Sequence, residues 1–155
     1  MTQGNSEVPN VLIANGVNLD LLGKREPEIY GTQTIDEINQ SLASKASILA
    51  QMGGFQGVNL SFFQTNNEHL FLEELSKEWD GAIVNAGAWT HTSIAIADRL
   101  RGLGLPFVEV HLSNLSLRED FRKISYTAPH AQGVVYGMGV HSYISALLGL
   151  LCQLS

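Results

Sequence analysis

The sequence predicts an α/β fold in which a parallel sheet is covered by helices on both faces. Short apolar runs alternate along the chain with longer segments whose apolar residues recur at helical spacing, which is typical of strands buried between helices. Glycine and proline residues separate many of these segments. The strands are expected at residues 11–14, 58–63, 81–84, 107–110 and 133–136.

The expected helices carry local start and stop signals. Thr34 followed by Glu37 matches a capping box, and Gly53-Gly54 closes the helix that begins there and runs to about residue 52. A helix over residues 92–103 cannot continue through Pro106. Further helices are expected at residues 66–79, at residues 117–122 and in the apolar segment SYISALLGLLCQL.

The length of 155 residues fits one domain that buries about two thirds of its unfolded surface. We see no linker, internal repeat or low-complexity segment, so residues 1–155 are expected to form a single domain. Residues 1–9 are polar and are expected to form a loosely ordered tail.

The composition disfavours several classes of partner. The net charge is −6 and the nine Lys and Arg residues are scattered, which argues against binding to nucleic acid or an anionic membrane. No apolar stretch approaches the roughly 20 residues needed to cross a bilayer, and no signal peptide is visible.

The single cysteine, Cys152, cannot form an internal disulfide and is expected to be a small core residue. A cytoplasmic location is compatible with this cysteine content.

The segment REPEIYG, residues 25–31, combines a guanidinium with a phenol. Pro27 within it and the glycine at its end favour a loop over a helix interior. A fixed cation near a tyrosine stabilises the phenolate, so Arg25 could make Tyr30 a general base. The alternative is a surface loop in which Arg25 pairs with a neighbouring glutamate and Tyr30 covers apolar surface.

Three of the expected strands end in polar side chains. Asn15 follows the first strand, Asn85 follows the third, and Glu109 and His111 end the fourth. The carboxyl ends of parallel strands share one edge of the sheet, where ligands bind in open α/β folds. Glu109 and His111 are two residues apart, so both would lie on one side of the strand and the carboxylate could orient or charge the imidazole. Structural roles, as a turn residue, a salt-bridged carboxylate and a hydrogen-bonded histidine, are the alternatives.

Other polar residues have two interpretations each. His91 could contact a ligand or satisfy backbone groups at a helix start. No GxSxG motif is present, so Ser113 is better suited to holding an anion than to nucleophilic attack. Arg118 and Arg122 are four residues apart, so on a helix they would share either a ligand-contacting face or a solvated charged one. The five histidines and one cysteine show no metal-binding pattern.

Several ordered segments are more specific than any single motif. They are NGVNLDLLGKREPEIYG, FFQTNNE, NAGAWTHTS, EVHLSNLSLREDFR and SYTAPHAQGVVYGMG. From about residue 11 to residue 150, the chain resembles the type II 3-dehydroquinases, also called 3-dehydroquinate dehydratases. The resemblance implies a flavodoxin-like sheet of five parallel strands in the order 2-1-3-4-5.

The resemblance also implies roles for individual residues. Arg25 and Tyr30 match a mobile catalytic loop in which Tyr30 removes a proton from C2 of 3-dehydroquinate. His111 matches the general acid that protonates the departing C1 hydroxyl, Glu109 the carboxylate that orients it, and Asn15 the residue that holds an enolate-stabilising water. The implied substrate-positioning residues are Asn85, His91, Leu112, Ser113, Arg122 and, presented from a neighbouring subunit, Asp98.

The implied reaction converts 3-dehydroquinate to 3-dehydroshikimate through an enolate, with no cofactor and no metal. The implied assembly is a homo-oligomer, a dodecamer built of trimers. The reaction would serve aromatic amino acid biosynthesis through the shikimate pathway, or quinate breakdown. A flavodoxin-like small-molecule binding module without turnover is the main alternative, and an esterase is a further one. Val17, Ala86 and Trp89 depart from residues frequent in the family and could alter loop rigidity or packing.

Overall fold

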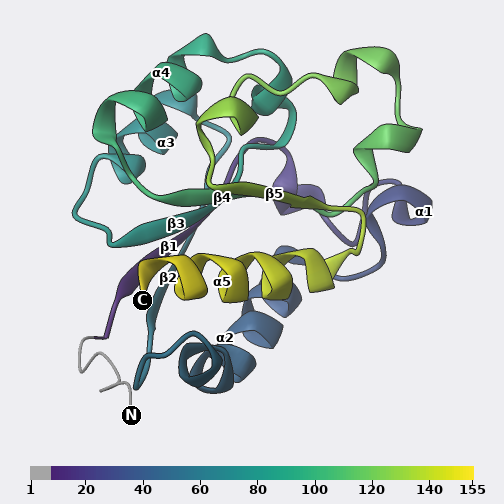
Figure 1. Ribbon diagram of the computed structural model, residues 1–155. Helices are drawn as coiled ribbons and strands as arrows, with labels where there is room; N and C mark the ends of the chain where they lie inside the picture. The colour runs from purple at the N-terminus through teal and green to yellow at the C-terminus, as the bar shows by residue number, and fades with distance from the viewer. Residues whose placement is uncertain (1–7) are drawn as a thin grey trace.

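The sheet contains five parallel strands in the order β2-β1-β3-β4-β5 (Figure 1). The computed structural model describes residues 8–155. The order confirms the flavodoxin-like topology that the sequence resemblance implies. The strands are β1 (Asn10–Asn15), β2 (Asn59–Gln64), β3 (Gly81–Asn85), β4 (Phe107–His111) and β5 (Gly133–Tyr136).

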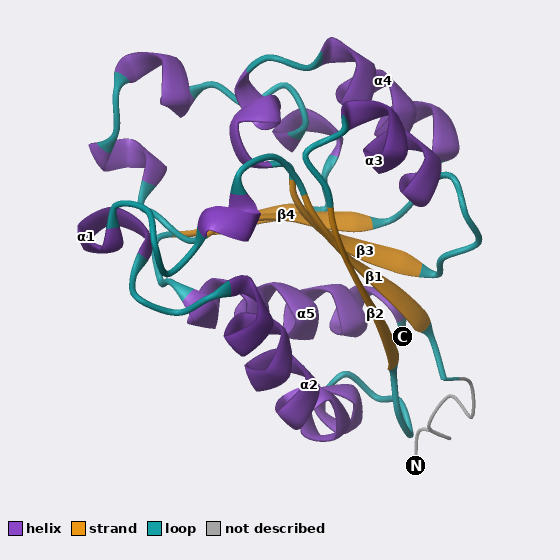
Figure 2. Cartoon of the chain, turned by 180° about the vertical axis from the view of Figure 1, so that it is seen from behind, coloured by secondary structure: helices purple, strands orange, loops and turns teal. Residues whose placement is uncertain are grey.

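Two pairs of helices cover the two faces of the sheet (Figures 1 and 2). One face packs against α2 (Ile35–Met52) and α5 (Val140–Leu154), and the other packs against α3 (Glu68–Leu75) and α4 (Ile94–Leu103). Burial of apolar side chains on both faces is the main driving force for this layering. Within residues 8–155, no helix is both long enough and apolar enough to cross a membrane.

The alternation of side chains along each strand decides which face a polar residue reaches. In β1, Val11 and Ile13 pack on the side of α2 and α5, so Asn15 belongs to that side. In β4, Val108 and Val110 pack there, so Glu109 and His111 belong to the opposite side. The strand ends therefore present amides toward one face of the sheet and the carboxylate–imidazole pair toward the other.

The capping box at Thr34 is present as the sequence predicts. The Thr34 side chain accepts a hydrogen bond from the backbone of Glu37, whose carboxylate accepts one from the backbone of Thr34. The α3 and α4 helices exist but are shorter than expected. They begin after the side-chain caps Asn67 and Ser93, because each cap satisfies a free N–H group of the first turn.

Three local expectations are wrong. A continuous helix over residues 117–122 does not form; two 3-10 turns, Leu115–Leu117 and Asp120–Lys123, flank an extended Arg118. The proline-containing loop includes a single helical turn, α1 (Pro27–Tyr30), because proline at the first helical position loses no required hydrogen bond. Cys152 is exposed, since it lies outside the buried stripe of α5.

The N-terminal expectation lies mostly outside the described residues. Residues 1–7 of the expected tail are not described. Val8 is exposed, whereas Pro9 is buried and its carbonyl accepts a hydrogen bond of 2.9 Å from the backbone of Asn59.

Candidate active site

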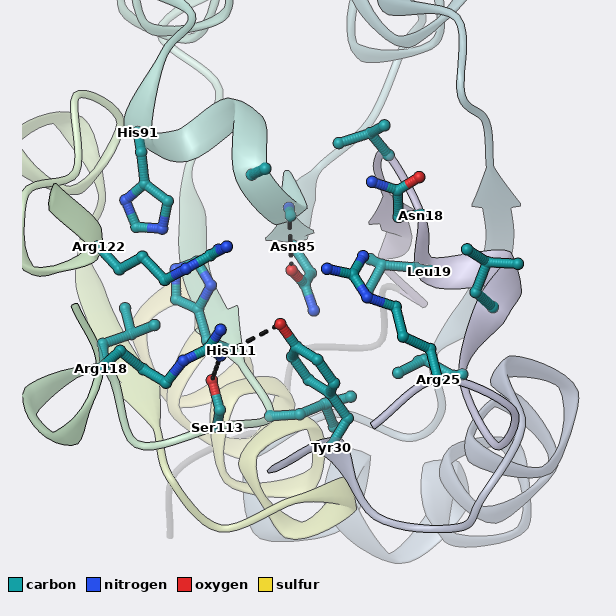
Figure 3. Close-up of a pocket in the computed structure, with 17 residues that line it drawn as sticks. Asn18, Leu19, Arg25, Tyr30, Asn85, His91, His111, Ser113, Arg118 and Arg122 are labelled. Atoms are coloured by element: carbon teal, nitrogen blue, oxygen red, sulfur yellow. Dashed lines mark hydrogen bonds between the residues drawn. The ribbon is translucent and has the colours of Figure 1, made fainter. Parts of the chain in front are cut away.

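A pocket opens at the carboxyl edge of the sheet, where the sequence places the strand-end residues (Figure 3). Its walls come from the segments that follow β1, β3 and β4, together with α1 and the turns around Arg118. Asn15 and Asn85 are register partners in β1 and β3, and Val84 and Glu109 are partners in β3 and β4. The parallel register therefore brings residues distant in sequence to one site.

Tyr30 projects into this pocket between two arginines (Figure 3). Arg118 Nη1 donates a hydrogen bond of 3.1 Å to the Tyr30 hydroxyl and one of 3.3 Å to Ser113 Oγ. The guanidinium carbons of Arg118 and Arg25 lie 5.3 Å and 5.8 Å from the centre of the Tyr30 ring. Arg25 also pairs with Glu26 at 3.1 Å, so its pocket position and its local ion pair coexist. The cation that contacts the phenol oxygen directly is Arg118.

The His111 imidazole forms a hydrogen bond with the Glu109 carboxylate. The distance from His111 Nε2 to Glu109 Oε1 is 2.7 Å, and both side chains are buried. With Nε2 donating to the carboxylate, Nδ1 is the ring nitrogen left for other contacts. His91 also lines the pocket, with its ring stacked on His111 at 6.4 Å between centroids. Burial lowers the pKa of His91, which favours its neutral form at neutral pH.

Three hydroxyl groups surround the Glu109 carboxylate. Thr90 donates to Oε1 at 3.0 Å, while Ser125 and Thr127 donate to Oε2 at 3.0 Å and 2.6 Å. Burial alone would raise the pKa of Glu109, but the contacts with His111, Thr127 and Ser125 outweigh it and lower that pKa. Glu109 is therefore a charged, hydrogen-bonded carboxylate that fixes the orientation of the His111 ring.

Replacing Thr127 with valine should remove one of these donors and make the loss of stability dependent on pH. Because the folded-state pKa of Glu109 is lowered, its ionised form adds stability above its unfolded pKa and loses it as pH falls through the folded value. Thr127→Val should therefore cost about 1 kcal/mol or more of unfolding free energy at neutral pH. The difference from wild type should narrow below about pH 4.

Urea unfolding at several pH values measures this difference. Thr32→Val, at an exposed threonine with no side-chain hydrogen bond among the described residues, is the matched control and should show little change at any pH. A Thr127→Val deficit that is equally large in acid would contradict the charge-dependent role of the hydroxyl.

The two strand-end amides are joined by a buried tyrosine from α5. The Tyr143 hydroxyl donates to Asn15 Oδ1 at 2.6 Å and accepts from Asn85 Nδ2 at 2.7 Å. Asn85 lines the pocket, whereas Asn15 is fully buried and does not line it. Tyr143 joins the site through its packing and was not a sequence candidate.

The structure brings together most of the sequence-predicted site residues. Those lining the pocket are Arg25, Tyr30, Asn85, His91, His111, Leu112, Ser113 and Arg122. Asn15 and Glu109 do not line it, but Glu109 contacts His111, and Asn15 is connected to Asn85 through Tyr143. Asp98 is exposed on α4, where it pairs with Arg101 at 3.3 Å, and is not part of this pocket.

Sequence reasoning did not name Asn18 or Tyr143 as contributors to the site. For Arg118 the sequence favours a solvated charged face over ligand contact, and its only signal for the site is the spacing from Arg122. Asn18 lines the pocket with a positive φ of 66°, a conformation that the turn-forming NGVN segment tolerates.

Trp89 packs edge-on against Phe71, with 5.6 Å between the ring centroids, as a packing residue should. Among residues 8–155, no three His, Cys, Asp or Glu side chains are grouped to hold a metal ion.

Comparisons with known proteins agree with this fold and pocket. The family model described as Dehydroquinase class II matches residues 9–151. The 3-dehydroquinate dehydratase of Alkalilimnicola ehrlichii is 46% identical over 151 residues, covering 95% of each chain. That of Prochlorococcus marinus is 45% identical over 148 residues, covering 94% of this chain and 97% of the relative. The crystal structure of the type II dehydroquinase from Butyrivibrio crossotus matches with a TM-score of 0.84 at 32% identity, covering 92% of this chain and 97% of that one. The chain therefore belongs to the class II dehydroquinase family.

Proposed function

We propose that this protein is a hydro-lyase that dehydrates 3-dehydroquinate to 3-dehydroshikimate without a cofactor. The observation that carries the proposal is the meeting of Tyr30, held by Arg118, and His111, held by Glu109, in one pocket. A phenol beside cations can serve as a base, and an imidazolium beside a carboxylate can serve as an acid. Family membership and the names of the relatives support the same substrate.

The first step is proton abstraction by the Tyr30 phenolate. The phenolate oxygen forms an O–H bond as the C2–H bond breaks, and the electron pair moves onto the C3 carbonyl oxygen to give an enolate. Arg118 and Arg25 stabilise the phenolate, because a nearby positive charge favours the ionised form of an acid. Asn15 stabilises the enolate oxygen through hydrogen bonding, directly or across a water.

The second step expels the C1 hydroxyl as water. His111 gives its proton to the departing oxygen, the C1–O bond breaks, and the enolate electrons form the C1–C2 double bond of an enone. Glu109 remains charged and stabilises the imidazolium before it donates. Asn85, His91, Arg122 and the Leu112–Ser113 segment hold the hydroxyl and carboxylate groups of the substrate in position.

Ultraviolet absorbance tests this reaction directly. Adding 3-dehydroquinate to purified protein should produce the growing absorbance of the enone product. A small-molecule binding module would bind the same compound without that signal, and an esterase would release an acid from an ester instead. No enone formation by well-folded protein would reject the proposed activity.

We also propose that the site is completed by a neighbouring subunit in a dodecamer built of trimers. Asp98 is exposed, and its pairing with Arg101 is a surface contact that can be exchanged at little cost. In a symmetric assembly such a carboxylate can reach the pocket of an adjacent copy. The proposed setting is the cytoplasm and the shikimate pathway, with residues 1–155 acting as one domain.

Light scattering should therefore give a mass many times the 16.9 kDa of one chain. Asp98→Asn should weaken substrate binding, seen as a KM raised by about tenfold, which is one lost charged hydrogen bond. Glu73→Gln, at an exposed carboxylate of α3, is the control and should leave KM unchanged. A fully active monomer would exclude the shared-site model.

A further inference from the structure

Tyr143 is a buried tyrosine for which the proposed mechanism has no direct use. It lies on α5, its side chain is fully buried, and its hydroxyl bridges Asn15 and Asn85 at the carboxyl ends of β1 and β3. A buried hydroxyl needs hydrogen-bond partners, so the simplest explanation is that the two amides supply them. The direction of the hydrogen bonds also fixes how the two amides are oriented.

One backbone group fixes the donor and the acceptor in each of these hydrogen bonds. The Gly87 N–H can only donate, and it donates to Asn85 Oδ1 at 3.1 Å (Figure 3). The amide nitrogen of Asn85 must then face Tyr143, and it donates to the hydroxyl oxygen. The single hydroxyl proton of Tyr143 remains for Asn15, whose facing atom must be its carbonyl oxygen.

The neutral form of Tyr143 preserves this direction. Burial raises the pKa of Tyr143 well above its usual value, so the side chain stays a neutral phenol and keeps its proton. Tyr143 therefore cannot exchange its donor role for an acceptor role toward Asn15.

The consequence appears at the other end of the Asn15 amide. Its Nδ2 is shielded from solvent and has no hydrogen-bond partner among the residues that the structure describes. Asn15 adjoins the pocket, because its register partner Asn85 and the residues at 17–19 line the wall. An unpaired buried donor is energetically unfavourable, and the fixed direction of the hydrogen bonds prevents the amide from turning over to find a partner.

We propose that Tyr143 is a positioning residue that locks the Asn15 amide so that its N–H group, and not its carbonyl, serves the enolate oxygen. The proposal rests on the function proposed above, in which negative charge develops on that oxygen. In direct contact, an N–H donor stabilises the developing charge, whereas a turned amide would present a carbonyl oxygen and repel it. The series of hydrogen bonds that fixes this orientation starts at the Gly87 N–H and continues through Asn85 and Tyr143 to Asn15.

Tyr143→Phe tests the proposal, because it preserves the buried ring and removes only the hydroxyl. We expect kcat to fall by about 10- to 100-fold, less than the roughly 100- to 1,000-fold loss for a removed oxyanion donor, because the Asn15 amide stays in place but is no longer held in one orientation. KM should change by less than about threefold. Tyr136→Phe is the matched control, since its hydroxyl also makes a side-chain contact, with Ser116 at 3.0 Å, but lies outside the pocket. It should leave kcat unchanged.

A double-mutant cycle separates positioning from general stability. If Tyr143 acts through Asn15, adding Tyr143→Phe to Asn15→Ala should lower kcat no further than Asn15→Ala alone. Equal losses in both backgrounds would overturn the proposal. If Tyr143→Phe folds poorly, Asn15→Asp assayed at about pH 8 replaces it, because an ionised carboxylate keeps an acceptor toward Tyr143 but has no N–H.

Each outcome of these experiments bears on a defined claim. Loss of turnover in Asn15→Asp supports the need for the amide donor, and full turnover overturns the proposal. Turnover by wild type with no effect of Tyr143→Phe overturns the positioning role but leaves the proposed function standing. Absence of enone formation by wild-type protein overturns the proposed function, and this inference with it.

Discussion

Replacing Tyr30 with phenylalanine is expected to lower kcat by about a thousandfold, in the middle of the range for a lost general base. Phenylalanine keeps the ring that packs between Arg25 and Arg118 but has no oxygen to accept the C2 proton. Substrate binding should therefore change little, and the fold should be retained. Steady-state kinetics combined with a binding titration will separate the two effects.

Tyr126→Phe provides the comparison, because Tyr126 is exposed and lies outside the pocket. Its turnover should match that of wild type. A Tyr30→Phe variant that makes product at nearly the wild-type rate would show that another group removes the proton.

His111→Ala is the second substitution with a large expected effect, again a loss of about a thousandfold in product formation. It removes the proton donor and also leaves the Glu109 carboxylate without one of its four partners. His130→Ala is the control, since His130 is exposed and lies outside the pocket. Circular dichroism and unfolding curves should accompany both variants, because an unpaired buried carboxylate destabilises the fold.

Deuterium exchange can divide the two proton transfers between the two residues. His111→Ala retains Tyr30, so it should exchange the C2 proton of 3-dehydroquinate with deuterated solvent while forming little enone. Tyr30→Phe should do neither. NMR spectroscopy of the substrate measures the exchange, and normal product formation by His111→Ala would refute the assignment of the acid.

Much of the fold was predictable because its signals are local. The apolar runs of β1, β3 and β4, the capping box at Thr34 and the break at Pro106 each act over a few residues. The prediction of a helix over residues 117–122 was wrong because a stronger local signal competes there. The helical appearance of this segment was only a spacing of two arginines, while the Asn114 side chain caps a shorter turn by accepting from the backbone of Ser116.

Part of the site was also predictable, since topology follows from the alternation of strands and helices. In a parallel sheet the carboxyl ends of all strands lie at one edge. This places Asn15, Asn85 and the Glu109–His111 pair close together. The spacing of Glu109 and His111 sets their contact along one strand. Such inferences need only the periodicity of the backbone.

The sequence by itself determined the α/β architecture, the strand-end residues and the family. The tertiary structure alone decided which cation contacts Tyr30, which hydroxyls hold Glu109 and how Tyr143 orders the two amides. Arg118 and Tyr30 are 88 residues apart, and Tyr143 and Asn15 are 128 apart. No pattern of propensity or spacing encodes such pairs, because their contact depends on how helices and turns pack against the sheet after the chain has folded.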